Sequence, residues 1–389
     1  MKYNFDERIN RYNTGSVKYD LCEAYFKEKD LIPAWVADTD FRTCVSVEEA
    51  LQKGVNQNIY GYAFRGDKYF SSIIEWYKKR HEIDLMKNWI SYCPGVVAGL
   101  VTSILSFTRP GDKIIIQTPV YTPFFQVILS NGRQLVENPL KEENGYYSMD
   151  FEDLEKKIDN KTKMLILCSP HNPVSRVWDQ LELEKLIEIA RKNDIMIVSD
   201  EIHSDLVFDK KFISMLHYKG LLDKMVILNA ASKTFNIAAL ATSYAIIPHS
   251  KNMEKYNETL EILAIAMPNM FGLRALEAAY SEGEEYLHEL KAYLNENFKL
   301  VEMMIEQNGL EVHLTKPEGT FLAWLDFRKY GLSQVELMRR LHKNAKVGVQ
   351  SGEVFSASKG TGFVRMNIGT QREVVREIMV RIISEFKKS

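Results

Sequence analysis

The sequence has few cysteines and no excess of charge of either sign. Its four cysteines lie far apart in 389 residues, with no C-x-x-C pair and no histidine pair nearby at zinc spacing. Neither a disulfide framework nor a structural metal is therefore expected. Lysine and arginine (50) nearly balance aspartate and glutamate (52), which argues against the basic surface typical of nucleic-acid binding. We expect a globular protein that does not bind nucleic acid.

Long apolar runs are also missing. No uninterrupted apolar stretch reaches the length of about 18 residues that a membrane-spanning helix needs. The amino terminus, MKYNFDERINRYN, is polar and lacks the basic and then apolar layout of a signal peptide. We therefore expect a cytoplasmic protein without a membrane partner.

Short apolar runs alternate with longer amphipathic stretches between about residues 85 and 230. This alternation is typical of βαβ units, and the continuous apolarity of the runs fits parallel strands covered on both faces. A helix is predicted over residues 181–192, where Leu183, Leu186, Ile187 and Ala190 share one face. The predicted strands are residues 89–93, 113–117, 164–168, 195–199 and 225–229.

The pattern changes near residue 283. A long charged amphipathic run covers residues 284–308, and short strand candidates follow at residues 320–326, 346–350 and 363–367, a mixture typical of a smaller α+β domain. The chain also exceeds the usual size of a single core. We predict an α/β protein in three parts: an amino-terminal arm packing with the small domain (1–45), a large domain (46–283) and a small carboxy-terminal domain (284–389).

Two of the predicted strands end in a turn or an aromatic residue, at the edge where open parallel sheets bind ligands. Gly95, Val96 and Val97 follow the first strand and open a helix whose free N–H groups would suit a phosphate. Such a turn is more often a packing feature. Tyr121 follows the second strand and would lie against a flat ligand; the alternative is a core tyrosine.

The next three strand ends carry an amide, an acid and a lysine. Asn172 lies in a turn fixed by Pro170 and Pro173, which alone would be an ordinary turn. Asp200 follows a buried strand, where a carboxylate needs a cationic partner such as a protonated ring nitrogen. Lys233 alone would be a solvated surface charge. Taken together, the five strand ends predict one binding site.

With Asn172, Asp200 and Lys233 in this order, the chain resembles the fold-type I enzymes of pyridoxal 5′-phosphate (PLP), the aspartate aminotransferase superfamily. Within it, the chain is most similar to the MalY/PatB group of cystathionine β-lyases, also called C–S lyases. The likeness runs nearly end to end and implies a large PLP-binding domain and a smaller α+β domain. The segments that carry it are 33–41 (PAWVADTDF), 60–62 (YGY), 169–173 (SPHNP), 199–206 (SDEIHSDL) and 232–238 (SKTFNIA).

The resemblance implies a role for each residue at the cofactor ring. Lys233 would hold PLP as a Schiff base and later act as the general base. Asp200 would keep the pyridine nitrogen protonated, Asn172 would donate to the phenolic oxygen, and Tyr121 would stack on the ring. Two interpretations of His203 remain. It contacts the phenolic oxygen, which we prefer, or its hydrogen bonds are satisfied by the protein beneath the ring.

The resemblance also implies contacts to the phosphate and to the substrate. Gly95, Val96, Val97 and Ser232 would bind the phosphate. Tyr60 of the partner subunit would reach the same phosphate, which makes a homodimer the expected functional unit. Arg365 would clamp the substrate carboxylate with its two terminal nitrogens, beside Tyr121 and Asn172.

Several positions depart from the pattern of the group. Ala98 stands where proline is usual, and Ser175 and Ala239 stand where glycine is usual. Ser356-Ala357, in the loop over residues 351–362, replaces an expected glycine, and Gly369-Thr370-Gln371 replaces a more typical Ala-x-Pro ending. None of these changes removes a catalytic group. They are expected to reshape the substrate pocket and so affect the choice of substrate.

The resemblance implies a C–S β-lyase that cleaves L-cystathionine or cysteine conjugates to a thiol, pyruvate and ammonia. Lys233 would remove the α-proton and a thiolate would leave the β-carbon. Return of the proton to the cofactor would instead give a class I/II aminotransferase, the second hypothesis. A PLP-binding protein with a mainly regulatory role is the third.

Overall fold

The computed structural model describes residues 2–387, and its largest sheet has seven strands in the order β2-β10-β9-β8-β7-β3-β4. Six strands run in one direction, and only β10 is antiparallel to its neighbours. The predicted α/β class with a mainly parallel sheet is confirmed. The strands are β2 (Ile90–Cys93), β3 (Lys113–Ile116), β4 (Gln134–Glu137), β7 (Thr162–Cys168), β8 (Met196–Asp200), β9 (Met225–Asn229) and β10 (Ser243–Ile246).

All five strands predicted for this region are present in the large sheet. Every residue of β8 and β9 is buried, as expected for strands covered on both faces. The sequence prediction missed β4 and β10. The edge strand β4 is only partly buried, and small residues (AALAT) run into β10 without a turn signal, so neither forms a separate apolar run.

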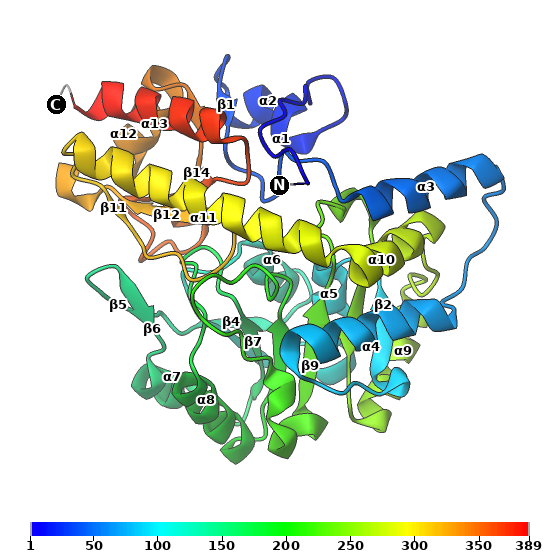
Figure 1. Cartoon of the computed structure of the whole chain (residues 1–389). Coiled ribbons are helices and arrows are strands. Elements are labelled where there is room, and N and C mark those ends of the chain that lie inside the picture. Colours follow the sequence, from blue (N-terminus) through cyan, green and yellow to red (C-terminus); the bar gives the residue numbers. More distant parts are fainter. Residues whose placement is uncertain (1, 388–389) are drawn as a thin grey trace.

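Helices cover both faces of the large sheet (Figure 1). One core lies between the sheet and α5 (Val96–Phe107), α6 (Pro123–Leu129) and α9 (Ser250–Ile262). The other lies between the sheet and α4 (Asp67–His81), α8 (Gln180–Lys192) and α10 (Met270–Glu282). Alternate strand residues face the two cores, as with Ile114 and Ile115. α3 (Val45–Gln57) packs on α10, and α7 (Phe151–Lys157) packs on α8.

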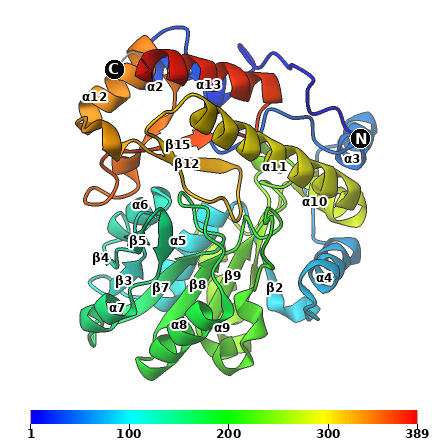
Figure 2. The same ribbon diagram turned by 60° about the vertical axis from the view of Figure 1, so that its left-hand side comes forward.

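The carboxy-terminal region contains a four-stranded antiparallel sheet in the order β11-β12-β15-β14, which lies above the large sheet in Figure 2. The amphipathic run over 284–308 forms a helix. The strands near 320–326 and 363–367 are confirmed, whereas the candidate at 346–350 is divided into β13 and β14. The elements are α11 (Glu284–Gln307), β11 (His313–Leu314), β12 (Leu322–Asp326), α12 (Gln334–Arg339), β13 (Val347–Gly348), β14 (Gln350–Ser351), β15 (Phe363–Asn367) and α13 (Arg372–Phe386). A separate hairpin, β5 (Lys141–Glu143) and β6 (Tyr146–Ser148), lies between β4 and α7 in the chain.

The amino-terminal segment contains more regular structure than its weak periodicity suggests. It forms α1 (Val17–Asp20), α2 (Cys22–Phe26) and β1 (Ile32–Pro33), elements too short for a sequence period to show. β1 pairs in parallel with β13. Lys18 is fully buried, with its Nζ 2.7 Å from Asp40 Oδ2, and Arg11 binds both Asp38 and Asp40. The division at residues 45 and 283 stays a prediction.

Within residues 2–387, no helix combines the length and the apolar character that crossing a membrane would require. The same residues contain no group of three or more histidine, cysteine, aspartate or glutamate side chains arranged to hold a metal ion.

Candidate active site

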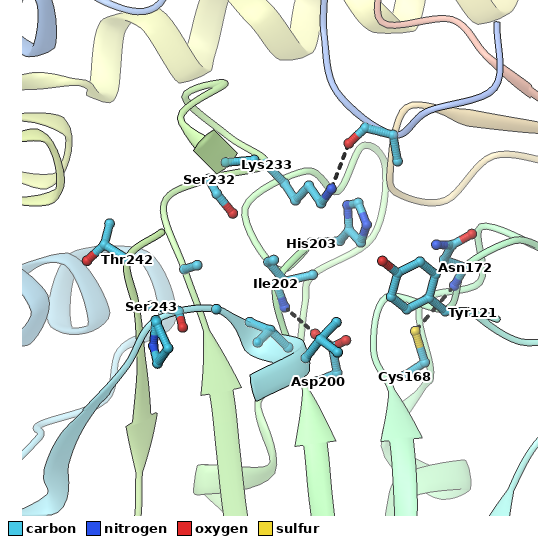
Figure 3. Close-up of a pocket in the computed structure, with 17 residues that line it drawn as sticks. Tyr121, Cys168, Asn172, Asp200, Ile202, His203, Ser232, Lys233, Thr242 and Ser243 are labelled. Carbon is cyan, nitrogen blue, oxygen red and sulfur yellow. Dashed lines mark hydrogen bonds between the residues drawn. The ribbon is translucent and has the colours of Figure 1, made fainter. Parts of the chain in front are cut away.

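One pocket collects residues from the ends of six strands of the large sheet. Figure 3 shows Lys233 and Asp200 on opposite sides of this pocket, with Tyr121 and Asn172 toward one end and Thr242 toward the other. The structure therefore brings together the strand ends that the sequence analysis singled out. The predicted site residues that line the pocket are Gly95, Val96, Val97, Tyr121, Asn172, Asp200, His203, Ser232 and Lys233.

Asp200 ends β8 and is buried beneath the pocket. Its Oδ1 accepts the backbone N–H of Ile202 at 3.1 Å. Burial raises the pKa of the carboxyl to about 7, and the Ile202 N–H and the charge of Lys233 oppose this shift only in part. A cationic group placed against Asp200 would remove this cost.

Lys233 lies in the turn after β9. The turn is closed by the N–H of Phe235, which donates to Ala231 O at 2.9 Å, and it is anchored by the fully buried Phe235 ring. The Lys233 Nζ donates to Ala37 O at 2.6 Å. Burial lowers the pKa of the ammonium to about 8, with Asp38 raising it and Arg365 lowering it further. A lysine with this pKa is suited to act as a base or a nucleophile near neutral pH.

Arg365 reaches the same region from β15, next to the pocket-lining Asn172. Its Nη1 donates to Asn172 Oδ1 at 3.1 Å, and its Nη2 donates to Trp35 O at 2.7 Å and to Gln350 Oε1. The guanidinium is buried, its centre lies 4.8 Å from the centroid of the Phe355 ring, and its Nε has no hydrogen-bond partner within residues 2–387. Burial lowers the pKa of Arg365 to about 10, so the group stays charged and available to a carboxylate.

The amino-terminal end of α5 borders the pocket through Gly95, Val96 and Val97. Its N-cap residue, Gly95, has no side chain to cap the helix, so the first N–H groups of α5 suit an anion. The hydroxyl of Thr242, a residue that also lines the pocket, is buried without a partner in the described chain. Together with Ser232, these donors fit a phosphate group.

His203 and Tyr121 present uncharged rings to the pocket. Burial, together with the charges of Lys233 and Arg365, holds the pKa of His203 well below its ordinary value. The His203 Nδ1 is buried and finds no partner in the part of the chain that the structure describes, which favours a ligand contact over a histidine satisfied within the protein. Burial raises the pKa of the Tyr121 hydroxyl, so this ring is neutral as well.

Tyr60 lies outside the pocket within its own chain. Its side chain is 60% exposed, and its ring centroid is 6.0 Å from that of Phe271. Ile59, Tyr62 and Phe64 in the same segment are also exposed. This exposure leaves the Tyr60 side chain accessible to a contact outside its own chain.

The sequence analysis missed several residues that line the pocket. Thr242 and Ser243 lie at the amino end of the antiparallel β10, which meets the same edge of the sheet as the carboxyl ends of the parallel strands. Because the sequence did not predict β10, no pattern placed the hydroxyls of these two residues at the sheet edge. Cys168, Ile202, Ala230 and Ala238 also line the pocket, and of these Ile202 directly precedes the predicted His203.

Three of the positions that depart from the group's pattern, Ala98, Ser175 and Ala239, are not among the residues that line this pocket. Ser175 has φ of 58°, a conformation that favours glycine. Its Oγ donates to Leu322 O at 2.8 Å and contacts Thr320 Oγ1 at 3.0 Å. These contacts compensate for the backbone conformation and tie the turn that carries Asn172 to β12.

The protein is an α/β enzyme with the aspartate aminotransferase-like fold. Its features are a seven-stranded, mainly parallel sheet, a second antiparallel sheet, and a lysine opposite an acid at the edge of the large sheet. Residues 30–382 match the family described as aminotransferase class I and II. The chain belongs to this family.

Individual relatives within this family match nearly the whole chain. The chain is 38% identical to cystathionine beta-lyase PatB of Bacillus subtilis over 384 residues, which cover 97% of this chain and 98% of PatB. Among solved structures, cystalysin from Treponema denticola, which contains pyridoxal 5′-phosphate, matches with a TM-score of 0.96 and 34% identity over all of both chains. The PLP-bound C–S lyase of Staphylococcus hominis matches with a TM-score of 0.92 and 32% identity, covering 99% of this chain and 98% of the lyase.

Proposed function

We propose that this protein is a PLP-dependent C–S β-lyase that converts L-cystathionine or cysteine conjugates to a thiol, pyruvate and ammonia. The observation that carries the proposal is the pair formed by Lys233, whose pKa is lowered to about 8, and the buried Asp200 on the other side of one pocket. The relatives named above as cystathionine beta-lyase and C–S lyase support the reaction class.

The pocket fits PLP on three independent features. Asp200 is a buried acid that a ring cation would stabilise. The free end of α5 and the unpartnered Thr242 hydroxyl suit a phosphate. Lys233 is placed to hold the cofactor covalently. When bound, PLP supplies an electron sink that stabilises negative charge on the substrate's α-carbon.

The remaining residues of the site act on the cofactor ring and phosphate. We assign the phosphate to Gly95, Val96, Val97, Ser232 and Thr242, all of which line the pocket. Asn172 would donate to the phenolic oxygen, Tyr121 would lie against the ring, and the neutral His203 would contact the cofactor. The unpartnered His203 Nδ1 supports this contact.

Substrate binding and proton transfer fall to Arg365 and Lys233. Arg365 binds the α-carboxylate, and its bonds to Asn172, Trp35 and Gln350 hold the guanidinium in a fixed orientation. Lys233 then removes the proton from the α-carbon, a task that a pKa near 8 favours over that of an ordinary lysine. The carbonyl of Ala37 accepts an N–H of Lys233 and keeps its Nζ on the pocket side of the turn.

We also propose a homodimer in the cytoplasm in which Tyr60 of the partner subunit contacts the phosphate. The exposed aromatic side chains at Tyr60, Tyr62 and Phe64 support an interface, since adjacent large apolar groups in water are costly. The four free cysteines, all buried, are compatible with a reducing compartment.

The proposal is tested with purified protein carrying PLP. We expect release of pyruvate and a free thiol from L-cystathionine without any keto acid. Turnover that needs a keto-acid acceptor and gives no pyruvate would show an aminotransferase instead. This is the alternative because the matching family is described as aminotransferase class I and II. Activity without a protein partner would also argue against a mainly regulatory role.

Replacement of the lysine gives the matched variants. Lys233→Ala should lower the rate by about 100-fold or more, because a positioned general base contributes at least this much. Lys219→Ala, which removes an exposed lysine outside the site, should leave the rate unchanged. Equal activity of the two variants would refute the role of Lys233.

A further inference from the structure

A second buried carboxylate, Asp205, lies behind the turn that carries Lys233 and outside the pocket. Its Oδ2 accepts the hydroxyl of Thr234 at 3.1 Å, and its Oδ1 accepts the indole N–H of Trp76 at 3.1 Å. Asp205, Thr234 and Trp76 are all buried. The carboxylate therefore joins the residue next to Lys233 to the helix α4.

The charges around Asp205 do not form a close ion pair with it. Arg80 Nε lies 3.9 Å from Oδ1, beyond hydrogen-bond distance. His81 Nε2 lies 4.0 Å away, and burial lowers the pKa of this histidine to about 3, so it is neutral. Lys291 adds a weaker attraction. Burial raises the pKa of Asp205, and its direct contacts are hydrogen bonds from neutral groups.

The partners of Asp205 are rigidly held. Trp76 stacks on Tyr280 with ring centroids 4.8 Å apart and an angle of 7°. The Trp76 ring also meets Phe235, the second residue after Lys233, edge to face at 5.9 Å. Since α4 packs on α10, the carboxylate connects the Lys233 turn to a fixed part of the large core.

We propose that Asp205 is a positioning residue for Lys233, and this rests on the proposed role of Lys233 at the cofactor. Lys233 and Thr234 are consecutive, and their side chains leave the turn in different directions, one into the pocket and one to Asp205. By holding Thr234, Asp205 fixes the backbone from which the Lys233 side chain extends. His203, which lines the pocket, lies two residues before Asp205, so the same carboxylate borders both segments.

The test compares two substitutions at position 234 in the enzyme carrying PLP. Thr234→Val keeps the shape of the side chain and removes the hydroxyl, whereas Thr234→Ser keeps the hydroxyl. We expect Thr234→Val to lower kcat about 10- to 100-fold with KM unchanged, as expected for misplacement of a reacting group. We also expect it to shift the pH at which the absorbance of the Lys233-linked cofactor changes. Thr234→Ser should restore both properties.

Thr108→Val is the matched control for the loss of a buried threonine hydroxyl. Thr108 Oγ1 donates to Ile104 O at 2.6 Å at the end of α5, away from the pocket. This variant should lose stability, seen as a lower Tm, without a change in kcat or in the spectral pH profile. If Thr234→Val behaves like Thr108→Val, Asp205 has only a structural role and the proposal is wrong.

Asp205→Ala supplies a second measurement. If the carboxylate acts through Thr234, the Thr234→Val change should cause little further loss of kcat in the Asp205→Ala background. Fully additive losses would contradict the proposal. Borohydride reduction followed by peptide mapping separates this question from the proposed function. A cofactor adduct absent from Lys233 would refute the anchor itself, whereas an adduct on Lys233 with unaltered Thr234→Val kinetics would refute only the positioning role.

Discussion

At the scale of single residues, burial acts on Asp200 and Lys233 in opposite directions. It raises the pKa of the acid to about 7 and lowers that of the lysine to about 8, because a low-dielectric site disfavours both charged forms. Near neutral pH, each group is therefore close to its titration point. A ligand that brings a cation to Asp200 and reacts with the Lys233 amine would relieve both costs.

The raised pKa of Asp200 predicts a pH dependence of stability in protein prepared without cofactor. The folded state holds a proton up to about pH 7, whereas the unfolded chain releases it near about pH 3.9. This contribution to the free energy of unfolding is complete at low pH and is lost as the pH rises through about 7. Asp200→Asn cannot lose this proton, so its Tm should fall less than that of the wild type between about pH 5 and about pH 8.

A second buried acid, Glu201, requires that the Tm of Asp200→Asn be compared with that of the wild type at each pH. Burial raises the pKa of Glu201 to about 7 as well, so some loss of stability with rising pH remains in Asp200→Asn. The difference between the two Tm curves isolates Asp200. Parallel curves would mean that Asp200 is already charged in the folded protein at low pH.

At the scale of helices and strands, the sequence revealed the parallel part of the site but not its antiparallel part. Asn172, Asp200 and Lys233 follow apolar runs, so their position at the sheet edge could be inferred from the pattern alone. Thr242 and Ser243 could not, because no turn residue separates them from the small residues before β10. Ser175 illustrates a second limit. The sequence shows that position 175 carries a serine instead of the usual glycine. It does not show that the Ser175 hydroxyl donates to Leu322 O, because these residues are 147 positions apart.

The end of α5 and the start of β10 predict how the cofactor phosphate is held. Thr242→Val removes a buried hydroxyl that has no partner within the described protein. A hydrogen bond to a charged group contributes about 1.5–3 kcal/mol, so the Kd for PLP should rise about 10-fold or more. Equilibrium dialysis or cofactor fluorescence measures this change.

Thr102→Val is the control for this prediction. Thr102 is also buried, but its Oγ1 already donates to Ala98 O at 2.9 Å within α5. This change should lower stability without altering the affinity for PLP. An unchanged Kd in Thr242→Val would place the phosphate away from β10.

At the scale of the whole molecule, the site depends on contacts between distant parts of the chain. Lys233 donates to Ala37 O, and Arg365 donates to Trp35 O, so residues 35 and 37 connect the large sheet to β15. No local pattern predicts such contacts, since each joins positions roughly 200 or more residues apart. Before the structure, this segment stood out only as one of those that carry the resemblance to a family, residues 33–41. We propose that the exposed aromatic segment around Tyr60 extends the same dependence to a second subunit.

Hybrid dimers test whether two chains complete each site. Tyr60→Phe should weaken cofactor binding, and Lys233→Ala should abolish the chemistry, so each variant alone is poorly active at limiting PLP. In a hybrid dimer, one site would combine Lys233 of the first chain with Tyr60 of the second and would be intact. Equal mixing with exchange of subunits should restore about one quarter of wild-type activity, since about half of the dimers are hybrid and each has one intact site of two. The control mixture uses Tyr62→Phe in place of Tyr60→Phe. The Tyr62 side chain is 97% exposed, and the Tyr62→Phe variant alone should keep the wild-type affinity for PLP. Activity of the Tyr60→Phe mixture equal to the average of the separate variants would mean that Tyr60 does not act across an interface.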